Sequence, residues 1–511
     1  MSPAAESRAP LWLWAALPVA VAAWLRGRGY GDLDPFTDEG ANILTALDPR
    51  VRTAFEPLEQ GRPWLVYLFR PAGRFPAEAL AVARLMSAGA GLLTMAALGW
   101  TLHRLGGRNA ALAGLWLWAV LPFAVWHERL ALQDPFVTAL LAGSLALLVA
   151  GLPEGRRWVW LGAGGLFSGA FLLKISAVLA LPWLGLVYIA HQRLQARPVF
   201  DRRLWLIPLG ALLPVLTLGG DLARLGSKLG QFGSKPGNYH VLPSLTHGGI
   251  LGSALERLAT WLGWYSGYGG WPILLLLVGA LGLAARGRQW LAFACAAAWA
   301  VSLLVAALFY NNTYARYSLP DYLPLILGLA LAWGATPSTD TRWRNGALVL
   351  FTVALVRWGM VSWGIGTDPR TAVVPAREID QYVTGPWSGH GTAEVLRWLT
   401  AYADRHHTRC LVLVHRYLRP GCYALLLAEL GDPRLGVVPF TVYEPAELAT
   451  ALAGLRHATA VTGQSATFFI LYEGSIYPVP ASLDQPGSPA GLVFTVDRGQ
   501  GETFSLYLIR P

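Results

Sequence analysis

Long apolar stretches alternate with short polar segments from the N-terminus to about residue 366. A helix needs about 20 mostly apolar residues to cross the hydrocarbon core of a bilayer. Lys174 interrupts the apolar stretch between residues 157 and 191 and divides it into two helices. About eleven windows of this kind lie near residues 10–25, 80–102, 109–126, 135–151, 157–173, 175–191, 204–219, 270–285, 289–309, 319–335 and 344–365. The pattern predicts a mainly α-helical, polytopic membrane bundle.

Composition agrees with a bilayer environment. The chain has 511 residues, of which 54% are hydrophobic and only 14% are charged, and its mean hydropathy is +0.42. A soluble protein ordinarily carries more charge. The formal net charge of +10 does not indicate a nucleic-acid partner here, because the arginines lie in short loops between apolar segments. Such arginines orient membrane helices, since cytoplasmic loops are enriched in basic residues.

The basic residues select one side of the membrane. Alternate loops carry Arg104, Arg108, Arg156, Arg157, Arg193, Arg197, Arg202, Arg203, Arg286, Arg288, Arg342 and Arg344. These loops are expected to be cytoplasmic, as is the N-terminus. The opposite side receives the acidic loop with Asp32, Asp34, Asp38 and Glu39. An odd number of spans then places the C-terminal segment outside as well.

The C-terminal segment changes character after the last apolar window. Strand-like runs at 410–415 and 467–472 alternate with helical stretches such as Thr392 to Asp404, which predicts a small external α/β domain. Cys410 and Cys422 are close enough in sequence to pair if this domain faces an oxidising compartment. We therefore divide the chain into a transmembrane domain, 1–366, with an external loop at 26–79 and an external segment at 220–269, and an external domain, 367–511.

Two adjacent carboxylates, Asp38 and Glu39, follow the first apolar window in the external loop. A carboxylate at this position can act as a general base that takes the proton of an acceptor hydroxyl, or it can hold a divalent metal ion. For an isolated pair, solvated loop acids or a helix N-cap would be the better interpretation.

The second external loop makes it less favourable to interpret Asp38 and Glu39 as solvated loop acids or a helix N-cap. It carries His127, Arg129 and Asp134 directly between two apolar windows, where charges are costly and usually functional. Asp134 precedes Pro135 and could cap the following helix while also serving function. His127 has the spacing of neither a metalloprotease helix nor a zinc finger, so an ordinary interfacial histidine is expected.

Two further cationic positions lie at the external ends of apolar windows. Lys174 can meet a lipid phosphate, although a lone lysine here could simply snorkel to the headgroups. Arg316, followed by Tyr317, precedes a Pro-containing apolar window, and the planar guanidinium of arginine suits phosphate.

These motifs together resemble the polytopic membrane glycosyltransferases of the GT-C fold, which include protein O-mannosyltransferases and the aminoarabinose transferases that act on lipid A. The matching elements are Asp38-Glu39, Arg62-Pro63-Trp64-Leu65, Ala83-Arg84-Leu85-Met86-Ser87, Arg129 with Asp134-Pro135, Leu173-Lys174, Arg316-Tyr317 and the run from Gln381 to Gly391. They occur in the family's order and are densest over residues 30–190. The Pro-Pro-Leu element often found in the first loop is replaced here by Arg62-Pro63-Trp64-Leu65.

The resemblance implies an inverting transferase that moves a sugar from a polyprenyl-phosphate carrier to an acceptor hydroxyl on a protein, glycan or lipid. Asp38 is carried over as the base, with Glu39 beside it and Asp134 as the second acidic position. The implied phosphate or substrate contacts are Lys174, Arg129, Arg316, Tyr317, Arg62 and Arg84. No cofactor is required by the resemblance; a divalent metal ion, where present in relatives, would here use Asp38, Glu39 and Asp134.

The resemblance also implies a location and partners. We expect an integral protein of a bacterial plasma membrane, with its active site external and with membrane lipids around it. Two alternatives remain at this point: a transporter or flippase of lipid-linked sugars, which would favour repeats and interrupted helices, and a non-catalytic membrane assembly protein with solvated acids. The sugar and the acceptor class are open.

Overall fold

The computed structural model describes residues 11–54, 62–154, 156–219, 250–286, 289–309, 314–334, 341–415, 420–440, 450, 452–454, 456–457, 466–473, 490–499 and 502–509. Contacts group the chain into two units. Unit 1 comprises Met1–Gly29, Pro57–Trp64 and Leu85–Val373, and unit 2 comprises Tyr30–Glu56, Leu65–Arg84 and Val374–Pro511. The acidic loop thus groups with the C-terminal segment, and the predicted domain boundary at residue 366 stays a prediction.

All regular secondary structure in the described part of unit 1 is helical. Its α-helices are α1 (Leu11–Gly27), most of α5 (Ala79–Val120), α6 (Pro122–Glu128), α7 (Asp134–Glu154), α8 (Arg157–Leu173), α9 (Leu181–Leu194), α10 (Leu206–Leu216), α13 (Ile250–Arg286), α14 (Trp290–Phe309), α15 (Tyr322–Gly334) and α16 (Thr341–Thr367). Short 3-10 helices precede α9, α10 and α15: η3 (Ile175–Ala180), η4 (Arg202–Trp205) and η6 (Ala315–Asp321). Every predicted apolar window falls on one or two of these helices; the window 109–126, for example, covers the end of α5 and most of α6.

Breaks in the helices occur at residues that explain them. Gly107 in α5 has φ 76° and Gly270 in α13 has φ 58°, a left-handed conformation that glycine adopts without steric cost. Lys174 separates α8 from η3 with an extended backbone, φ −158° and ψ 114°, which confirms the predicted division of residues 157–191. Of the predicted external segment 220–269, residues 220–249 lie outside the described residues, and 250–269 are helical.

Length separates these helices into two groups. Among the described residues, four helices are long and apolar enough to cross a membrane alone: Pro76–Val120, Ile175–Leu194, Trp290–Leu308 and Leu348–Thr367. The bent pair Ala254–Ile273 and Leu275–Ala285 would be a fifth. This is fewer than the predicted eleven, because helices such as α10 and α15 have only 11 and 13 residues and are preceded by separate 3-10 turns.

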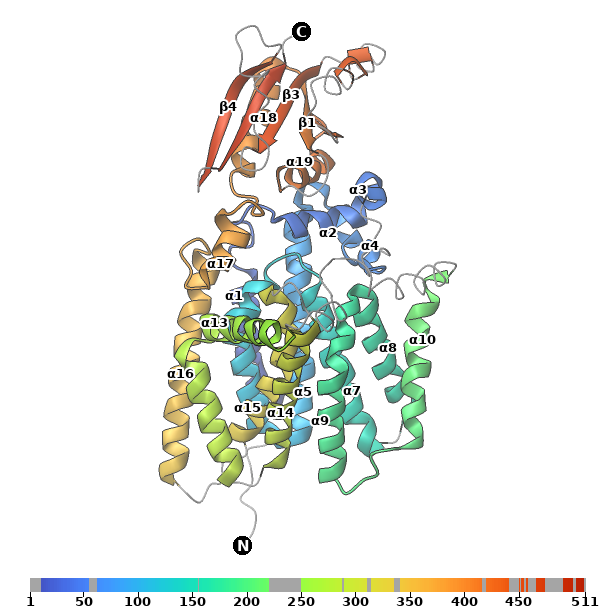
Figure 1. The fold of residues 1–511 in the computed structure, drawn as a ribbon, viewed down its shortest axis with the longest axis vertical. Helices are drawn as coiled ribbons and strands as arrows, with labels where there is room; N and C mark the ends of the chain where they lie inside the picture. The colour runs from blue at the N-terminus through green and yellow to red at the C-terminus, as the bar shows by residue number, and fades with distance from the viewer. Residues whose placement is uncertain are drawn as a thin grey trace. The chain divides into compact units, whose positions relative to one another are not determined.

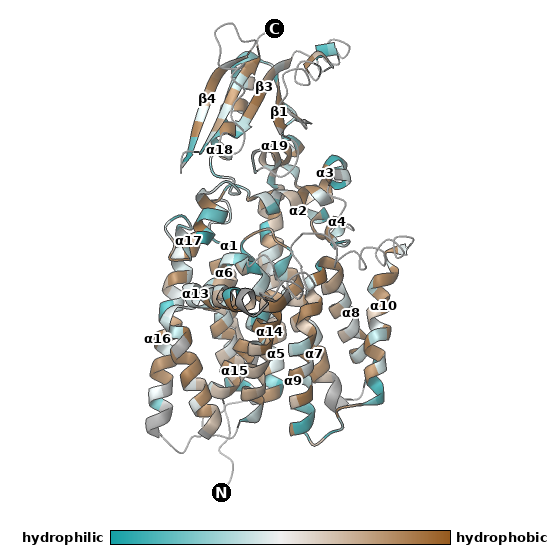
Figure 2. Cartoon of the chain, in the orientation of Figure 1, coloured by the Kyte–Doolittle hydropathy of each residue, from teal (hydrophilic) through white to brown (hydrophobic). Residues whose placement is uncertain are grey.

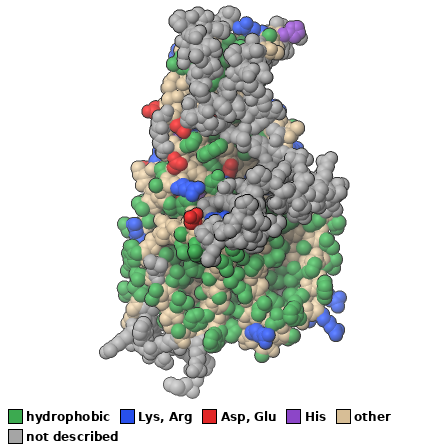
Figure 3. Space-filling model, in the orientation of Figure 1, with side chains coloured by type: hydrophobic (Ala, Val, Ile, Leu, Met, Phe, Trp, Pro, Cys, Tyr) green, Lys and Arg blue, Asp and Glu red, His purple; other side chains and the backbone are tan. Residues whose placement is uncertain are grey.

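The surface of unit 1 is apolar. Figure 2 shows its helices coloured mainly as hydrophobic, and the visible helix faces in Figure 3 carry mostly hydrophobic side chains. Large side chains that would be buried in a soluble protein are exposed here, among them Val278 (70%) and Trp290 (67%). Lipid is the medium that such a surface fits, so the chain is an integral membrane protein.

Small residues bring the helices of unit 1 together. α7, α8 and α10 lie side by side (Figure 1). A Cβ atom on Gly164 of α8 would overlap the carbonyl oxygen of Ile207, and one on Gly210 of α10 would overlap that of Leu161. The two backbones therefore touch, which is the packing that small residues permit between membrane helices.

Unit 2 combines the acidic loop with the C-terminal α/β segment. Its helices are α2 (Thr37–Leu47), α3 (Pro49–Ala54), α4 (Leu65–Leu68), η1 (Arg70–Arg74), η2 (Pro76–Glu78), the first turn of α5, α17 (Ala376–Ile379), the π-turn η7 (Asp380–Thr384), α18 (Thr392–His406) and α19 (Pro420–Gly431). A Cβ atom on Gly40 of α2 would overlap the side chain of Tyr423 on α19. Gly40 thus lets α2 pack directly on the α/β segment.

The sheet of unit 2 has five strands in the order β2-β1-β3-β5-β4. They are β1 (Arg409–His415), β2 (Leu435–Phe440), β3 (Ala466–Glu473), β4 (Ala490–Gly499) and β5 (Glu502–Ile509). β1 pairs in parallel with β2 and β3, and β5 pairs antiparallel with β3 and β4. The predicted α/β fold of this segment is confirmed. Cys410 and Cys422 are buried and are not joined to each other, so the disulfide considered from their spacing is not formed.

Candidate functional site

Asp38 and Glu39 lie in the first turn of α2, where the helix dipole favours negative charge, but their side chains have different surroundings. Glu39 is fully buried. Its two oxygens accept from Nε and Nη2 of Arg84 at 2.8 and 2.7 Å, and it also accepts from the backbone N–H of Phe36 at 3.1 Å. Asp38 is half-buried. Of the two carboxylates, Asp38 is the one placed to meet a substrate.

Arg84 holds the acidic loop together. Beyond Glu39, its guanidinium donates to the carbonyl oxygens of Tyr30 at 2.6 Å, Leu33 at 2.8 Å and Asp34 at 3.3 Å. These bonds occupy all five of its N–H groups. In this arrangement Arg84 organises the loop before α2, and its predicted contact with a phosphate stays a prediction.

The run from Gln381 to Gly391 supports the start of α2. Thr37 donates to the carbonyl oxygen of Trp387 through its backbone N–H at 3.1 Å and its hydroxyl at 2.7 Å. The N–H of Gly391 donates to Asp34 at 3.0 Å. Buried Arg498 donates to the carbonyl oxygen of Ser388 at 2.7 Å. This explains in physical terms why a motif far along the chain accompanies Asp38: it positions the helix turn that carries it.

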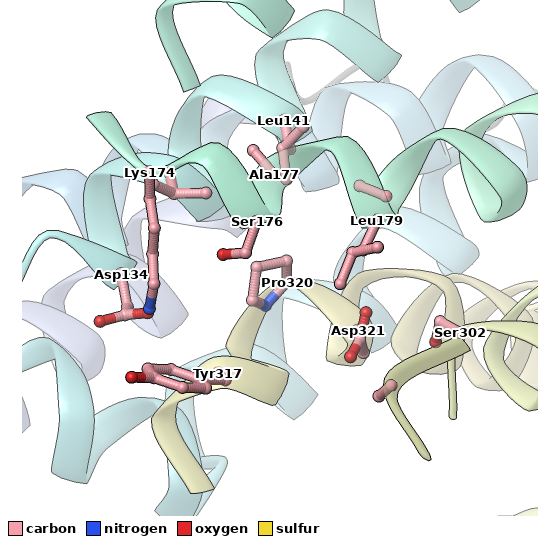
Figure 4. A pocket seen from close by; sticks show the side chains of 13 residues that line it. Asp134, Leu141, Lys174, Ser176, Ala177, Leu179, Ser302, Tyr317, Pro320 and Asp321 are labelled. Atoms are coloured by element: carbon pink, nitrogen blue, oxygen red, sulfur yellow. The ribbon is translucent and has the colours of Figure 1, made fainter. Parts of the chain in front are cut away.

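In unit 1, Asp134 and Lys174 form a buried ion pair. Asp134 is the first residue of α7, and Lys174 lies between α8 and η3. Lys174 Nζ is 2.5 Å from Asp134 Oδ1 and 3.7 Å from the ring centroid of Tyr317. Figure 4 shows the ammonium group between the carboxylate and the aromatic ring. The three predicted residues thus form one cluster, with both the ion pair and the cation–π contact fixing the ammonium.

Two more of the predicted cations, Arg62 and Arg316, affect the charge state of Lys174. Lys174 lies just outside the candidate span Ile175–Leu194. Burial lowers the pKa of Lys174 to about 8, against the attraction of Asp134, and the like charges of Arg62 and Arg316 lower it further. With its amide oriented to satisfy both groups, Gln133 accepts from Arg62 Nε and donates to the carbonyl oxygen of Leu173, each at 3.2 Å. Two further positive charges therefore act on the Lys174–Asp134 ion pair, an arrangement that favours an anion.

Arg129 has a different environment. Its guanidinium donates to the carbonyl oxygens of Ile365, of Arg28 at 2.7 Å and of Gly29 at 2.9 Å. It thus joins the C-terminal ends of α1 and α16, where carbonyl groups carry partial negative charge. Its predicted contact with the carrier phosphate stays a prediction.

The residues before Arg129 are also buried. Glu128 forms a buried ion pair with Arg26 and accepts from Trp118 Nε1 at 3.2 Å. His127, expected at an interface, is fully buried against Phe123 and lies 3.5 Å from the hydroxyl of Tyr268. Burial, with the charges of Arg316 and Lys174, holds the pKa of His127 well below its usual range.

The cluster of Lys174 lines a pocket whose other end contains residues that the sequence analysis did not single out. Besides Asp134, Lys174 and Tyr317, its polar lining consists of Ser176, Ser302 and Asp321 (Figure 4). Asp321 follows Pro320 within a predicted apolar window. A carboxylate inside such a window is itself a signal of function.

Metal-binding side chains do not cluster in the described residues: no three His, Cys, Asp or Glu side chains there come together in a way that could hold a metal ion. Asp38 and Glu39 belong to unit 2 and Asp134 belongs to unit 1. A divalent ion held by these three stays a prediction.

Comparison with known proteins places this architecture in a class. The sequence profile of the family described as dolichyl-phosphate-mannose-protein mannosyltransferase matches residues 67–218. No curated protein sequence matches the chain. The chain therefore carries a mannosyltransferase-like region that includes Arg84, Arg129, Asp134 and Lys174.

Solved structures extend the similarity to most of the chain. The crystal structure of ArnT from Cupriavidus metallidurans bound to undecaprenyl phosphate is 14% identical, with a TM-score of 0.57 over 97% of this chain and 98% of that one. The crystal structure of the same protein in its apo state is also 14% identical and covers the same shares of both chains, with a TM-score of 0.55. The oligosaccharyltransferase of Archaeoglobus fulgidus in complex with Zn and sulfate is 13% identical, with a TM-score of 0.50 over 90% of this chain and 68% of that one. The chain has the fold of these proteins, which confirms the predicted GT-C fold and the predicted resemblance to membrane glycosyltransferases.

Proposed function

We propose that the protein is an inverting glycosyltransferase that moves a sugar from a polyprenyl-phosphate carrier to an acceptor hydroxyl. The observation that carries this proposal is the group of cations at the Lys174–Asp134 pair: Lys174 and Arg316 are buried, and Arg62 is half-buried. Three positive charges beside the Asp134 carboxylate suit a phosphate group, and the burial of Lys174 and Arg316 strengthens their electrostatic effect because the local dielectric is low. A similar protein, ArnT, has been crystallised with undecaprenyl phosphate, which supports a carrier of this class.

The proposed reaction is a single displacement. Asp38 takes the proton of the acceptor hydroxyl, whose oxygen forms a bond to the anomeric carbon of the sugar. The bond between that carbon and the phosphate oxygen breaks, and its electron pair leaves with the polyprenyl phosphate. Lys174, Arg62 and Arg316 stabilise the negative charge on the departing phosphate. The products are the glycosylated acceptor, polyprenyl phosphate and protonated Asp38.

The remaining predicted site residues have supporting roles in this proposal. Glu39 and Arg84 position Asp38 through the loop they hold, rather than touching substrate. Asp134 and Tyr317 hold the Lys174 ammonium group. Arg129 joins helix ends next to the loop that carries Asp134, and it is a further candidate for the carrier phosphate.

The proposed location follows the arginine distribution. The N-terminus is cytoplasmic, and the site and the C-terminal segment are external, in a bacterial plasma membrane. The acceptor hydroxyl belongs to a protein, a glycan or a lipid, since a general base requires only a nucleophile with a proton to lose.

The test uses the full chain in lipid with polyprenyl-phosphate sugars and a membrane extract as the source of acceptor. Release of polyprenyl phosphate is compared for the wild type, Asp38→Asn and Asp32→Asn. Asp32 is an exposed acid of the same loop and serves as the matched control. We expect Asp38→Asn to lose turnover by at least about 100-fold, the lower range for a general base, with carrier binding kept, and Asp32→Asn to behave like the wild type.

Two outcomes would contradict the proposal. Undiminished turnover in Asp38→Asn would remove Asp38 from catalysis. Carrier binding without turnover in the wild type, for every sugar donor and extract supplied, would instead favour a transporter or an assembly protein.

A further inference from the structure

The pocket next to Lys174 is polar at two ends of opposite character (Figure 4). At one end, Lys174 pairs with Asp134 and lies over the Tyr317 ring. At the other end are Asp321, the last residue of η6, and Ser302 on α14. Pro320 and Ser176 lie between the two ends. The pocket therefore offers cationic groups on one side and a carboxylate on the other.

The Asp321 carboxylate retains unused capacity to accept hydrogen bonds. It is half-buried, and among the described residues its side-chain hydrogen-bond partner is Ser302. The single hydroxyl proton of Ser302 is also placed for donation to the carbonyl oxygen of Trp299, at 2.9 Å. One proton cannot serve both acceptors, and a carboxylate has about four acceptor positions. Among the described residues, no basic side chain forms an ion pair with Asp321.

A polar group without sufficient partners between membrane helices is costly unless something in the pocket satisfies it. An apolar polyprenyl chain would leave the carboxylate without a partner, and a phosphate would be repelled by it. A group that donates hydrogen bonds satisfies it. Sugar hydroxyls donate, and a sugar ammonium group would donate and also neutralise the charge.

We infer that Asp321 and Ser302 form the sugar subsite of this pocket, where they accept and exchange hydrogen bonds with the ring hydroxyls or an amino group of the donor sugar. The inference rests on the proposed function, in which the linked phosphate lies at the Lys174 end. The opposite charges at the two ends match a ligand that is anionic at its phosphate and carries hydrogen-bond donors on its sugar. Asp321 is therefore a residue that determines which donor is accepted.

The experiment compares two ligands that differ only in the sugar. Affinities for sugar-free polyprenyl phosphate and for polyprenyl-phosphate hexose are measured on the full chain in lipid. The variants are Asp321→Asn, which keeps the shape of the side chain, and Ser302→Ala. Ser318→Ala is the matched control, because Ser318 is a buried serine that bonds to the Ala315 carbonyl at 2.8 Å and does not line the pocket.

We expect Asp321→Asn to weaken binding of the sugar-bearing donor by about tenfold or more, as loss of a charged hydrogen-bond acceptor does. The affinity of Asp321→Asn for sugar-free polyprenyl phosphate should stay within about twofold of the wild-type affinity, because that ligand has no group that contacts Asp321. Ser302→Ala should change affinity in the same direction by less, and Ser318→Ala should change neither affinity. A larger loss for an amino-sugar donor than for the hexose would assign an ammonium group to Asp321, and an equal loss would assign hydroxyl groups.

Equal weakening of both ligands, or no weakening of either, in Asp321→Asn and Ser302→Ala would overturn the sugar subsite. If Asp321→Asn does not fold, Ser302→Ala alone decides between the two results. The proposed function is judged separately, by whether the wild type releases polyprenyl phosphate, so failure of one is distinguishable from failure of the other.

Discussion

The Glu39 carboxylate lies in the fork of the Arg84 guanidinium, with both of its oxygens bonded at 2.7 and 2.8 Å. Glu39 follows Asp38 directly in sequence, but the three carbonyl groups that Arg84 also binds show that the Glu39–Arg84 pair shapes the loop. Variants at Glu39 and Arg84 should therefore change stability, whereas a variant at the neighbouring Asp38 should change catalysis.

Arg84→Met is expected to destabilise unit 2 strongly. The change leaves a buried carboxylate and three loop carbonyls without donors, and removal of one partner of a buried ion pair costs about 3–5 kcal/mol. Chemical unfolding of the full chain, followed by the fluorescence of a probe in unit 2, measures the loss. Asp38→Asn is the comparison and should change the free energy of unfolding by less than about 1 kcal/mol.

The double variant Glu39→Gln, Arg84→Met provides the control for charge. It no longer buries an ion without its partner, so it should recover part of the stability lost in Arg84→Met. A single variant as stable as the wild type would show that the pair is not needed to hold the loop.

Lys174→Met is expected to weaken binding of polyprenyl phosphate by at least about tenfold, because charge-assisted hydrogen bonds to phosphate are worth roughly 1.5–3 kcal/mol. Tyr317→Phe keeps the ring face that lies 3.7 Å from the ammonium and should bind like the wild type. Tyr317→Leu removes the ring and should weaken binding by less than Lys174→Met does. Titration of labelled carrier into the protein in nanodiscs measures all three. Unchanged affinity in Lys174→Met would remove Lys174 from the phosphate site.

Local patterns in the sequence were sufficient for several parts of this architecture. The apolar windows predicted where helices lie, and Lys174 predicted the break between α8 and η3, because a charge and an extended backbone both interrupt an apolar helix. The strand-like runs at 410–415 and 467–472 predicted β1 and β3. These features depend on neighbours in sequence, which is why they could be predicted.

The pairings inside the site depend on packing and could not be predicted in the same way. Asp134 and Lys174 are 40 residues apart, and only the contact of α7 with α8 brings them together. The sequence shows Asp38 and Glu39 only as adjacent carboxylates, but adjacent helical residues point about 100° apart, and Glu39 turns inward to Arg84. Asp321 is visible in the sequence only as a carboxylate inside an apolar window, and its place beside Ser302 in the pocket depends on how η6 packs against α14.

Direct contact between α8 and α10 predicts that Gly210→Ala destabilises unit 1. The new methyl group would overlap the carbonyl oxygen of Leu161, and overpacking of this kind costs about 1–3 kcal/mol. Gly185→Ala in α9 is the matched control, because a Cβ atom there has no neighbour within 4 Å. The control should be neutral or more stable by up to about 1 kcal/mol. Thermal unfolding in detergent distinguishes them, and equal midpoints would contradict the close backbone contact.

Gly91 in α5 provides a sharper test, because the neighbour it would meet is a charged side chain. A Cβ atom at Gly91 would overlap the carboxylate of Glu128. That carboxylate has little freedom to move, since Arg26 and Trp118 hold its two oxygens. Gly91→Ala must therefore displace the buried pair, and we expect a loss of about 1–3 kcal/mol.

Gly89→Ala, two residues away in the same helix, meets no atom within 4 Å and should gain the usual helix preference of alanine, up to about 1 kcal/mol. Opposite signs for the two substitutions would show that Gly91 leaves room for the Glu128–Arg26 pair. Because Glu128 precedes Arg129 in the loop that carries Asp134, Gly91→Ala should also reduce binding of polyprenyl phosphate, whereas Gly89→Ala should leave it unchanged. Equal stability and equal carrier affinity in the two variants would contradict a fixed position for the Glu128 carboxylate.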